Sequence, residues 1–144
     1  MDFDYKLWHS RETIEYVRDF HKRFGVPIAQ EPCIPDLKTC ELRLSLMKEE
    51  LKEVEEAIHS KDLVNLLKEL TDLQYVLDGT YLSFGLDRLK ILATRDVHKS
   101  NLTKLGPGGK VLRNEQGKIL KPKTYRKPDL SKWFKDPEYH SEDR

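Results

Sequence analysis

Two neighbouring stretches of the sequence decide the fold class: residues 44–58, which read LSLMKEELKEVEEAI, and residues 63–77, which read LVNLLKELTDLQYVL. In each stretch apolar residues recur at steps of three and four, the spacing that brings side chains onto one face of an α-helix. We therefore predict two amphipathic helices, at about 39–59 and 63–84. Their predicted core-facing stripes are Leu44, Met47, Leu51, Val54 and Ile58 in the first, and Leu63, Leu66, Leu70, Leu73, Leu77 and Tyr81 in the second.

Proline and glycine residues mark the limits of two further helices. We predict one helix from about Ser10 to Phe24, because a Gly-Val-Pro sequence then ends the helical pattern. Residues 27–35 contain three prolines, which exclude a regular helix and predict an extended linker on the surface. A last helix is predicted from about Asp87 to about Leu105. The predicted fold class is all-α.

The composition changes after residue 106, where a Pro-Gly-Gly sequence is followed by a turn-rich and basic segment. We therefore divide the chain into a helical domain of residues 1–106 and a basic C-terminal extension of residues 107–144. Within the extension, residues 111–113 and 118–120 flank a turn that ends in Gly117, which is typical of a small hairpin with positive φ at the glycine. The extension is either a lid or subunit arm, or a flexible solubilising segment.

The composition excludes several classes of protein. A chain of 144 residues is the size of one domain, and its 26 basic and 25 acidic residues give no overall field that favours nucleic acid or an anionic membrane. No apolar run approaches the roughly 20 residues of a membrane span, and the first residues are acidic, unlike a signal peptide. We expect a cytoplasmic protein. Two cysteines without a Cys/His cluster give poor support for a zinc site or a disulfide.

Two acids of the first amphipathic helix lie where a merely solvated face would not place them. At about 100° per residue from Leu44, Glu53 falls at about 180° and Glu50 at about 240°, beside Leu46 at about 200° and Ala57 at about 220°. Both carboxylates therefore point where small or apolar side chains point. We expect partial burial, which is costly for a charge without a partner.

The second amphipathic helix repeats this pattern with Glu69 and Asp72. An acid pair at i, i+3 lies on one helix face, and two such helices packed antiparallel can bring four carboxylates together. Four close anions require compensation by basic side chains, protons or hard divalent cations, and oxygen ligands are those that Mg²⁺ prefers. The alternative is a helical bundle with salt-bridged acids, for which the available partners are Lys48, Lys52 and Lys68.

A third motif lies at the end of the last predicted helix, in residues 98–104. His98, Lys99, Asn101 and Lys104 can together grip phosphate, since a lysine supplies a point charge and an asparagine supplies both a donor and an acceptor. The simpler reading also stands. Lys104 then interacts only with the helix dipole, and Asn101 only faces solvent.

At these residues the chain resembles the MazG-like superfamily of all-α NTP pyrophosphatases, which includes the dimeric dUTPases and the phosphoribosyl-ATP pyrophosphohydrolases. The resemblance rests on Glu50-Leu51-Lys52-Glu53, on Glu69-Leu70-Thr71-Asp72 and on the preceding Glu49. Residues 97–104 and 117–122 are similar to a subgroup related to the phosphoribosyl-ATP pyrophosphohydrolases, some members of which hydrolyse dUTP. The segment between the acid pairs is shorter than in the dimeric dUTPases, so a dUTP preference does not follow.

The resemblance implies a metal site and an oligomer. It implies that Glu50, Glu53, Glu69 and Asp72 ligate Mg²⁺, for which Mn²⁺ can substitute, and that Glu49 adds a ligand or orients water. It also implies a four-helix-type bundle completed by a homodimer or homotetramer. His21 on an apolar stripe is either an edge of a base-binding pocket or a satisfied core histidine.

The predicted activity is cleavage of a nucleoside triphosphate into a monophosphate and pyrophosphate. In this hypothesis Glu49 or Glu50 positions the attacking water, and Lys104 assists departure of the pyrophosphate. The alternatives are hydrolysis of phosphoribosyl-ATP and a non-enzymatic helical adaptor whose acids are only a negative patch. Nucleic-acid binding by the basic extension ranks last, because its aromatic residues are scattered.

Overall fold

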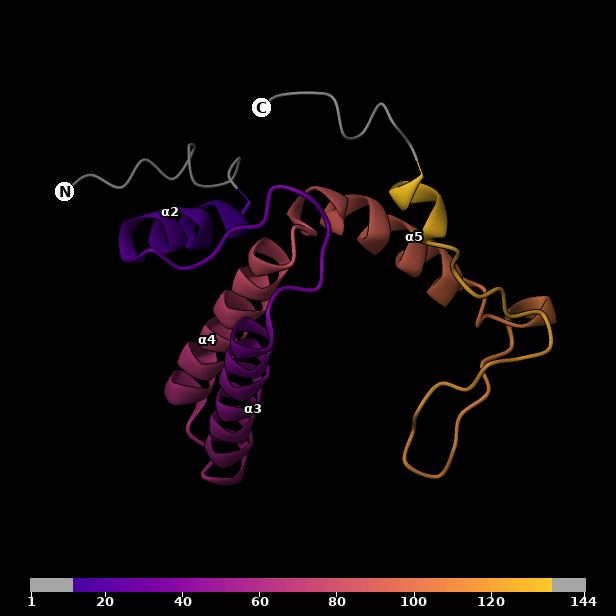
Figure 1. Cartoon of the computed structure of the whole chain (residues 1–144). Coiled ribbons are helices and arrows are strands. Elements are labelled where there is room, and N and C mark those ends of the chain that lie inside the picture. Colours follow the sequence, from indigo (N-terminus) through magenta and orange to yellow (C-terminus); the bar gives the residue numbers. More distant parts are fainter. Residues whose placement is uncertain (1–11, 136–144) are drawn as a thin grey trace, which may run out of the picture. The chain divides into compact units, whose positions relative to one another are not determined.

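The computed structural model describes residues 12–135, and the chain divides into two compact units that meet between Asp87 and Arg88 (Figure 1). The described residues are helical apart from turns, loops and one isolated antiparallel bridge, so the predicted all-α class is confirmed. The α-helices are α2 (Ile14–Phe24), α3 (Leu37–His59) and α4 (Leu63–Ser83) in the first unit, and α5 (Lys90–Leu102) in the second. None of them has the length and apolar character that crossing a membrane requires.

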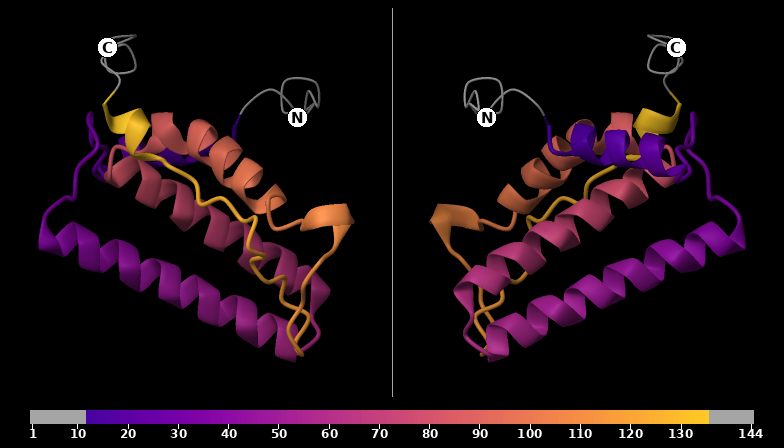
Figure 2. Two further views of the ribbon diagram at one scale, coloured as in Figure 1. Left: turned by 90° about the vertical axis from the view of Figure 1, so that its right-hand side faces the viewer. Right: turned by 90° about the vertical axis from the view of Figure 1, so that its left-hand side faces the viewer.

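Helices α3 and α4 form an antiparallel pair that lies side by side in both views of Figure 2. Each helix starts at an aspartate whose carboxylate accepts a backbone N–H of the first turn, Asp36 from Thr39 at 2.8 Å and Asp62 from Asn65 at 3.0 Å. The turn between the helices passes through Lys61, which has a φ of 57°. The observed helices agree with the predicted ones within about two residues, the usual uncertainty at helix ends.

The orientation of α3 differs from the sequence-based prediction. The predicted core stripe is largely exposed, with Leu44 at 52%, Leu51 at 58% and Ile58 at 53% of full exposure. Val54 is the one fully buried member of that stripe in the described structure, and the other buried positions of α3 are Arg43 and Ala57. The helix thus turns the flank that carries its acids, and not its leucine row, toward α4.

The leucine row of α4 is exposed in the same way. Leu63, Leu70 and Leu77 follow one another at seven-residue steps, and each is exposed in the single chain. Leu66, Leu73 and Tyr81 are half-buried, whereas the fully buried positions of α4 include Glu69 and Asp78. The periodicity identified an apolar row, but within residues 12–135 these three leucines are exposed and do not face the core as predicted.

Helix α2 packs against α4 and supplies the small apolar core of the first unit. Its side chains Ile14 and Val17 contact Leu82, and all three are at most 2% exposed. The helix begins at Ile14, later than predicted, and Ser10, the predicted start, lies outside the described residues. Phe24, the last residue of α2, is 70% exposed.

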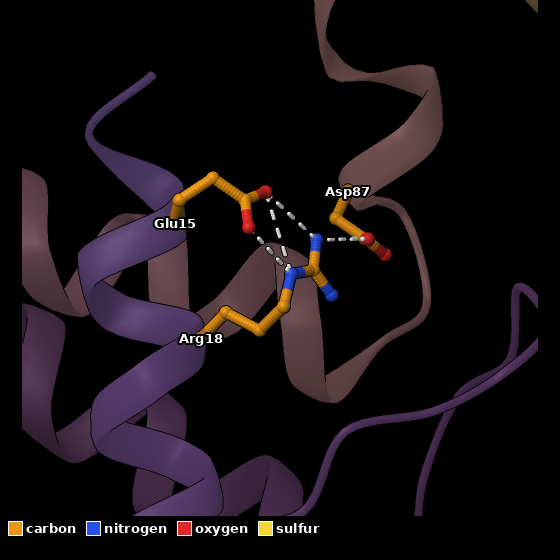
Figure 3. A network of polar contacts seen from close by, with 3 residues as sticks. All are labelled: Glu15, Arg18 and Asp87. Carbon is orange, nitrogen blue, oxygen red and sulfur yellow. Dashed lines mark hydrogen bonds and ion pairs between the residues drawn. The ribbon is translucent and has the colours of Figure 1, made fainter. Parts of the chain in front are cut away.

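A polar network adds a second attachment of α2 (Figure 3). The Arg18 guanidinium lies 2.8 Å from the Asp87 carboxylate and 3.2 Å from that of Glu15. Asp87 follows α4, so the arginine joins α2 to the chain beyond the C-terminus of α4. These hydrogen bonds and charges raise the pKa of Arg18 despite its partial burial.

The proline-rich linker contains no helix, as predicted, and it runs along the end of α4. Its backbone N–H groups at Ala29 and Cys33 donate to the carbonyl oxygens of Leu82 and Phe84, each at 3.0 Å. Gly85 allows this close approach, because it has a φ of 67° and a Cβ there would collide with the carbonyl of Glu31. The linker therefore carries the chain from α2 to the start of α3.

The second unit consists of α5 and the described part of the C-terminal extension, residues 107–135, here called the tail. α5 ends at Leu102 rather than near Leu105, and the N–H groups of residues 103–105 bond to carbonyls three residues back. The tail contains two short 3₁₀ turns, Pro107–Gly109 and Ser131–Phe134.

The predicted hairpin within the tail is reduced to a bridge between Arg113 and Ile119, without a named strand. Gly117 has a φ of 82°, as its place in a tight turn predicted. The division of the chain at residue 106 stays a prediction.

Candidate metal centre

The facing sides of α3 and α4 bring three carboxylates together. Glu50 of α3 and Glu69 and Asp72 of α4 each offer an oxygen, and these oxygens lie within 4.8 Å of one another. Glu69 is 5% exposed, whereas Glu50 and Asp72 are half-buried. The antiparallel packing of α3 and α4 brings these three carboxylates together.

Glu53 adds a fourth carboxylate to this group. A hydrogen bond with Glu69, followed by the negative charge of Glu69, raises the pKa of Glu53 above its ordinary value. Two carboxylates that share a hydrogen bond must share a proton. Glu53 therefore lies beside Glu69, and the charge of Glu50 also acts on it. We call Glu50, Glu53, Glu69 and Asp72 the acid cluster. Glu49 is exposed and acts on the cluster through its charge near Glu50.

Glu50 carries the feature that most favours a cation. Its Oε2 atom is buried and is the only such side-chain atom in the described residues without a hydrogen-bond partner. Burial raises the pKa of Glu50, and the charge of Asp72 raises it further. A buried oxygen without a donor is costly, and a hard divalent cation is a partner that an all-oxygen group of ligands suits.

Lysines neutralise only part of the cluster. Lys68 lies 2.8 Å from Asp72 and 3.3 Å from Glu69, and these contacts raise its pKa. Lys52 instead pairs with Glu56 at 3.9 Å, and Lys48 has no ion pair within residues 12–135. The salt-bridge alternative therefore holds for Lys68 alone among the three proposed lysines. One positive charge does not neutralise the four carboxylates of the acid cluster.

Arg43 and Gly79 lie along the same helix pair and were not among the predicted site residues. Arg43 is 4% exposed, and its guanidinium donates to the Val76 carbonyl at 2.6 Å and to the Thr80 hydroxyl at 3.2 Å. A Cβ on Gly79 would lie 2.5 Å from Arg43 Nη2 and 2.8 Å from His21 Nε2. A glycine inside a predicted helix was the one signal that a side chain passes closely there.

His21 is a buried and hydrogen-bonded side chain. Its Nδ1 lies 3.3 Å from the Pro27 carbonyl, and burial lowers its pKa, with a further contribution from the charge of Arg43. This geometry is the one expected of a core histidine. A role for His21 in binding a base stays a prediction.

The motif of residues 98–104 lies in the second unit, where its side chains separate onto two grooves. Lys99 lines one groove together with residues of the tail, and Asn101 and Lys104 line another whose remaining walls are apolar. His98 is exposed and lines neither groove. The motif therefore does not form a single grip, and the substrate-binding roles of these four residues stay predictions.

A family model described as phosphoribosyl-ATP pyrophosphohydrolase matches residues 17–101. This match covers more than half of the chain, from within α2 to the end of α5, and includes every carboxylate of the acid cluster. The chain belongs to the phosphoribosyl-ATP pyrophosphohydrolase family. The resemblance to the MazG-like all-α NTP pyrophosphatases is thereby confirmed. No curated protein sequence matches the chain.

Members of the phosphoribosyl-ATP pyrophosphohydrolase family hydrolyse an acid anhydride of a nucleotide, so the family gives this chain a pyrophosphohydrolase activity in general terms. Divalent metals are common in MazG-like pyrophosphohydrolases, and Glu50, Glu69 and Asp72 have the geometry of a metal site.

Proposed function

We propose that the protein is a Mg²⁺-dependent nucleoside triphosphate pyrophosphohydrolase that cleaves between the α- and β-phosphates. The observation that carries the proposal is the buried, unpartnered Oε2 of Glu50 beside Glu69 and Asp72. Mg²⁺ held by these residues and Glu53 would supply positive charge at the phosphates and lower the pKa of a bound water. Mn²⁺ would substitute, because it also accepts carboxylate ligands.

The residues of this chain then have distinct roles. The acid cluster binds the cation and fixes its position between α3 and α4. Glu49, exposed and next to Glu50, positions the attacking water, with Glu50 as the alternative. Lys68 holds Asp72 and Glu69 in place through its two ion pairs. Assistance of the leaving pyrophosphate by Lys104 remains part of the sequence-based hypothesis.

A homo-oligomer is the second part of the proposal. Exposed leucine and isoleucine side chains form seven-residue rows on both long helices, at Leu44, Leu51 and Ile58 on α3 and at Leu63, Leu70 and Leu77 on α4. Apolar rows of this length are costly in water and match a second amphipathic helix pair. A second copy of the chain, as homodimer or homotetramer, would complete the four-helix-type bundle.

Two substrates remain in competition. House-cleaning of the nucleotide pool, with dUTP or a non-standard nucleotide as substrate, fits a general triphosphate pyrophosphohydrolase. Phosphoribosyl-ATP is favoured by the family match itself. A cytoplasmic location suits either.

The test is to incubate the protein with Mg²⁺ and a panel of NTPs, dNTPs and phosphoribosyl-ATP, and to separate pyrophosphate from orthophosphate. We expect pyrophosphate and a monophosphate from at least one substrate. Orthophosphate and a diphosphate as the main products would refute the proposed cleavage, and no turnover with or without metal would favour the adaptor alternative.

A further inference from the structure

A groove of about 320 Å³ lies in the second unit between α5 and the end of the tail. Four basic side chains line it, Lys99 from α5 and Arg126, Lys127 and Lys132 from the tail. Two carboxylates, Asp96 and Asp129, also line it. We call this the basic groove.

The two carboxylates of the basic groove bind residues of the tail. Asp96 Oδ2 accepts the indole N–H of Trp133 at 2.8 Å and forms an ion pair with Lys132 at 3.1 Å. Asp129 accepts the Ser131 hydroxyl at 2.6 Å and its backbone N–H at 3.0 Å. Both acids therefore have their partners, and Lys132 is engaged as well.

Three cations remain available. Lys99, Arg126 and Lys127 have no ion pair with a carboxylate of residues 12–135, although they line a groove that contains two. Cations that line one groove without counter-charges favour an anionic ligand.

The position of Arg126 is fixed by its own backbone. Its carbonyl accepts the hydroxyl of Ser100 at 2.7 Å, and its N–H donates to the hydroxyl of Thr103 at 2.8 Å. Ser100 is 6% exposed, so the first of these bonds is shielded from water. Both backbone groups are thus bound to the last turn of α5 and its C-cap residue, and Arg126 lines the same groove as Lys99. Binding therefore requires little further ordering of the backbone at Arg126.

We propose that the basic groove is a binding site for a phosphate anion, either the phosphate chain of a nucleotide or free pyrophosphate. An arginine offers a planar pair of N–H donors to a phosphate, and the two lysines add point charges around it. In this proposal Arg126 and Lys127 bind the anion together with Lys99. Asn101 and Lys104 line a different groove and take no part. The basic groove shares no residue with the acid cluster and does not require a metal.

The groove suits a small anion better than a nucleic-acid strand. Single-stranded nucleic acid is held by aromatic faces on which bases stack. Here the Trp133 ring lies beneath the charged groups of Arg95, at 5.5 Å, and Lys132, at 4.9 Å. The nearby Tyr125 is half-buried, with Lys121 4.9 Å from its ring. Neither ring is free to stack on a base.

Calorimetric titration of the full chain with inorganic pyrophosphate in EDTA tests the proposal. EDTA removes any cation from the acid cluster, which then repels anions, so the signal reports the basic groove. We expect measurable binding that weakens with salt, and a loss of about tenfold or more in each of Lys99→Gln, Arg126→Gln and Lys127→Gln. Lys118→Gln is the matched control, an exposed lysine of the same tail outside the groove. Its affinity should equal that of the parent.

Two further ligands identify the source of the phosphate. A non-hydrolysable triphosphate nucleotide that binds in EDTA and is weakened by the same three variants assigns the groove to the nucleotide. Binding of pyrophosphate alone assigns it to the free anion. The proposal is overturned by absence of pyrophosphate binding, by equal affinities of groove and control variants, or by a single-stranded RNA that binds through these residues while pyrophosphate does not.

These outcomes are independent of the proposed hydrolysis. Pyrophosphate binding in EDTA by a protein without Mg²⁺-dependent turnover would support the proposed anion site and refute the proposed hydrolysis. Mg²⁺-dependent turnover without pyrophosphate binding in EDTA would support the hydrolysis and refute the anion site.

Discussion

Replacing Glu50 with glutamine should stabilise the metal-free protein, because the acid cluster stores repulsion that a cation would relieve. Glu50, Glu69 and Asp72 hold one oxygen each within 4.8 Å of the others. The ion pairs of Lys68 serve Glu69 and Asp72, and no ion pair within residues 12–135 serves Glu50. Glu50→Gln keeps the shape, removes both charge pairs that Glu50 makes, and lets its amide donate to a neighbouring carboxylate.

The geometry sets the size of the effect. Two unit charges 4.8 Å apart repel by about 1 kcal/mol in water and by about 3.5 kcal/mol at an effective dielectric constant of roughly 20. Even the weaker figure, applied to two pairs, amounts to about 2 kcal/mol. For a chain of this size such a gain raises the melting temperature by roughly 4 to 8 °C.

In Mg²⁺ the parent should have the higher melting temperature, whereas in EDTA Glu50→Gln should have it. An ion that binds only the folded form stabilises it by about 1 to 3 kcal/mol when its concentration is between several and 100 times its Kd. We expect the parent to gain this amount in millimolar Mg²⁺ and Glu50→Gln to gain much less. The assay is a thermal melt at pH 8 of each protein, with EDTA and with Mg²⁺.

Glu56→Gln is the control for this experiment. Glu56 lies on the same helix, exposed and paired only with Lys52 at 3.9 Å, so its removal should leave both melts and the Mg²⁺ response unchanged. A parent indifferent to Mg²⁺ together with a destabilised Glu50→Gln would refute the reasoning, since that is the behaviour of a purely structural group of salt-bridged acids.

Three further predictions concern the first unit. Burial raises the folded-state pKa of Glu50, and a hydrogen bond with Glu69 together with the charge of Glu69 raises that of Glu53. An acid with a raised pKa contributes stability that is present below the unfolded value and is lost as pH rises through the folded one. In EDTA the melting temperature of the parent should therefore fall relative to that of Glu53→Gln between pH 5 and 8, and a constant difference would contradict this. Gly79→Ala should cost about 1 kcal/mol or more in denaturant melts, because displacing the buried Arg43 and His21 outweighs the gain in helix propensity. The same substitution in an Arg43→Leu background should cost less, since only the contact with His21 remains, and an equal cost in both backgrounds would exclude Arg43 as a cause. Leu51→Asp should lower the molar mass found by light scattering, whereas a parent that is already monomeric at micromolar concentration would refute the oligomer.

The two long helices and the acid cluster could be predicted from the sequence, because helical periodicity and i, i+3 spacing are local properties. The angular calculation placed Glu50 and Glu53 beside Leu46 and Ala57, and the structure buries Ala57 and half-buries the other three. It could not say which face of α3 meets α4. The leucine rows stay exposed within residues 12–135, so apolar periodicity alone does not decide which face of a helix is packed.

Arg43 and the basic groove lay beyond sequence reasoning for a different reason. The sequence around a buried arginine does not differ from that around an exposed one. Arg43 is buried here because Gly79, 36 positions later, has no Cβ to collide with its guanidinium. The groove joins Lys99 to Arg126 through the hydroxyls of Ser100 and Thr103, a contact between distant residues that no local pattern encodes. The sequence predicted that residues 98–104 bind phosphate together, but it did not predict that Lys99 lines a different groove from Asn101 and Lys104.

The most direct test of the central claim is hydrolysis of the preferred nucleotide in ¹⁸O-labelled water with Mg²⁺, followed by ³¹P NMR of the products. The proposed activity places the label in the monophosphate and none in pyrophosphate, and Glu50→Gln should form labelled product far more slowly. Label in orthophosphate or in pyrophosphate would show attack at another phosphorus and would contradict the account.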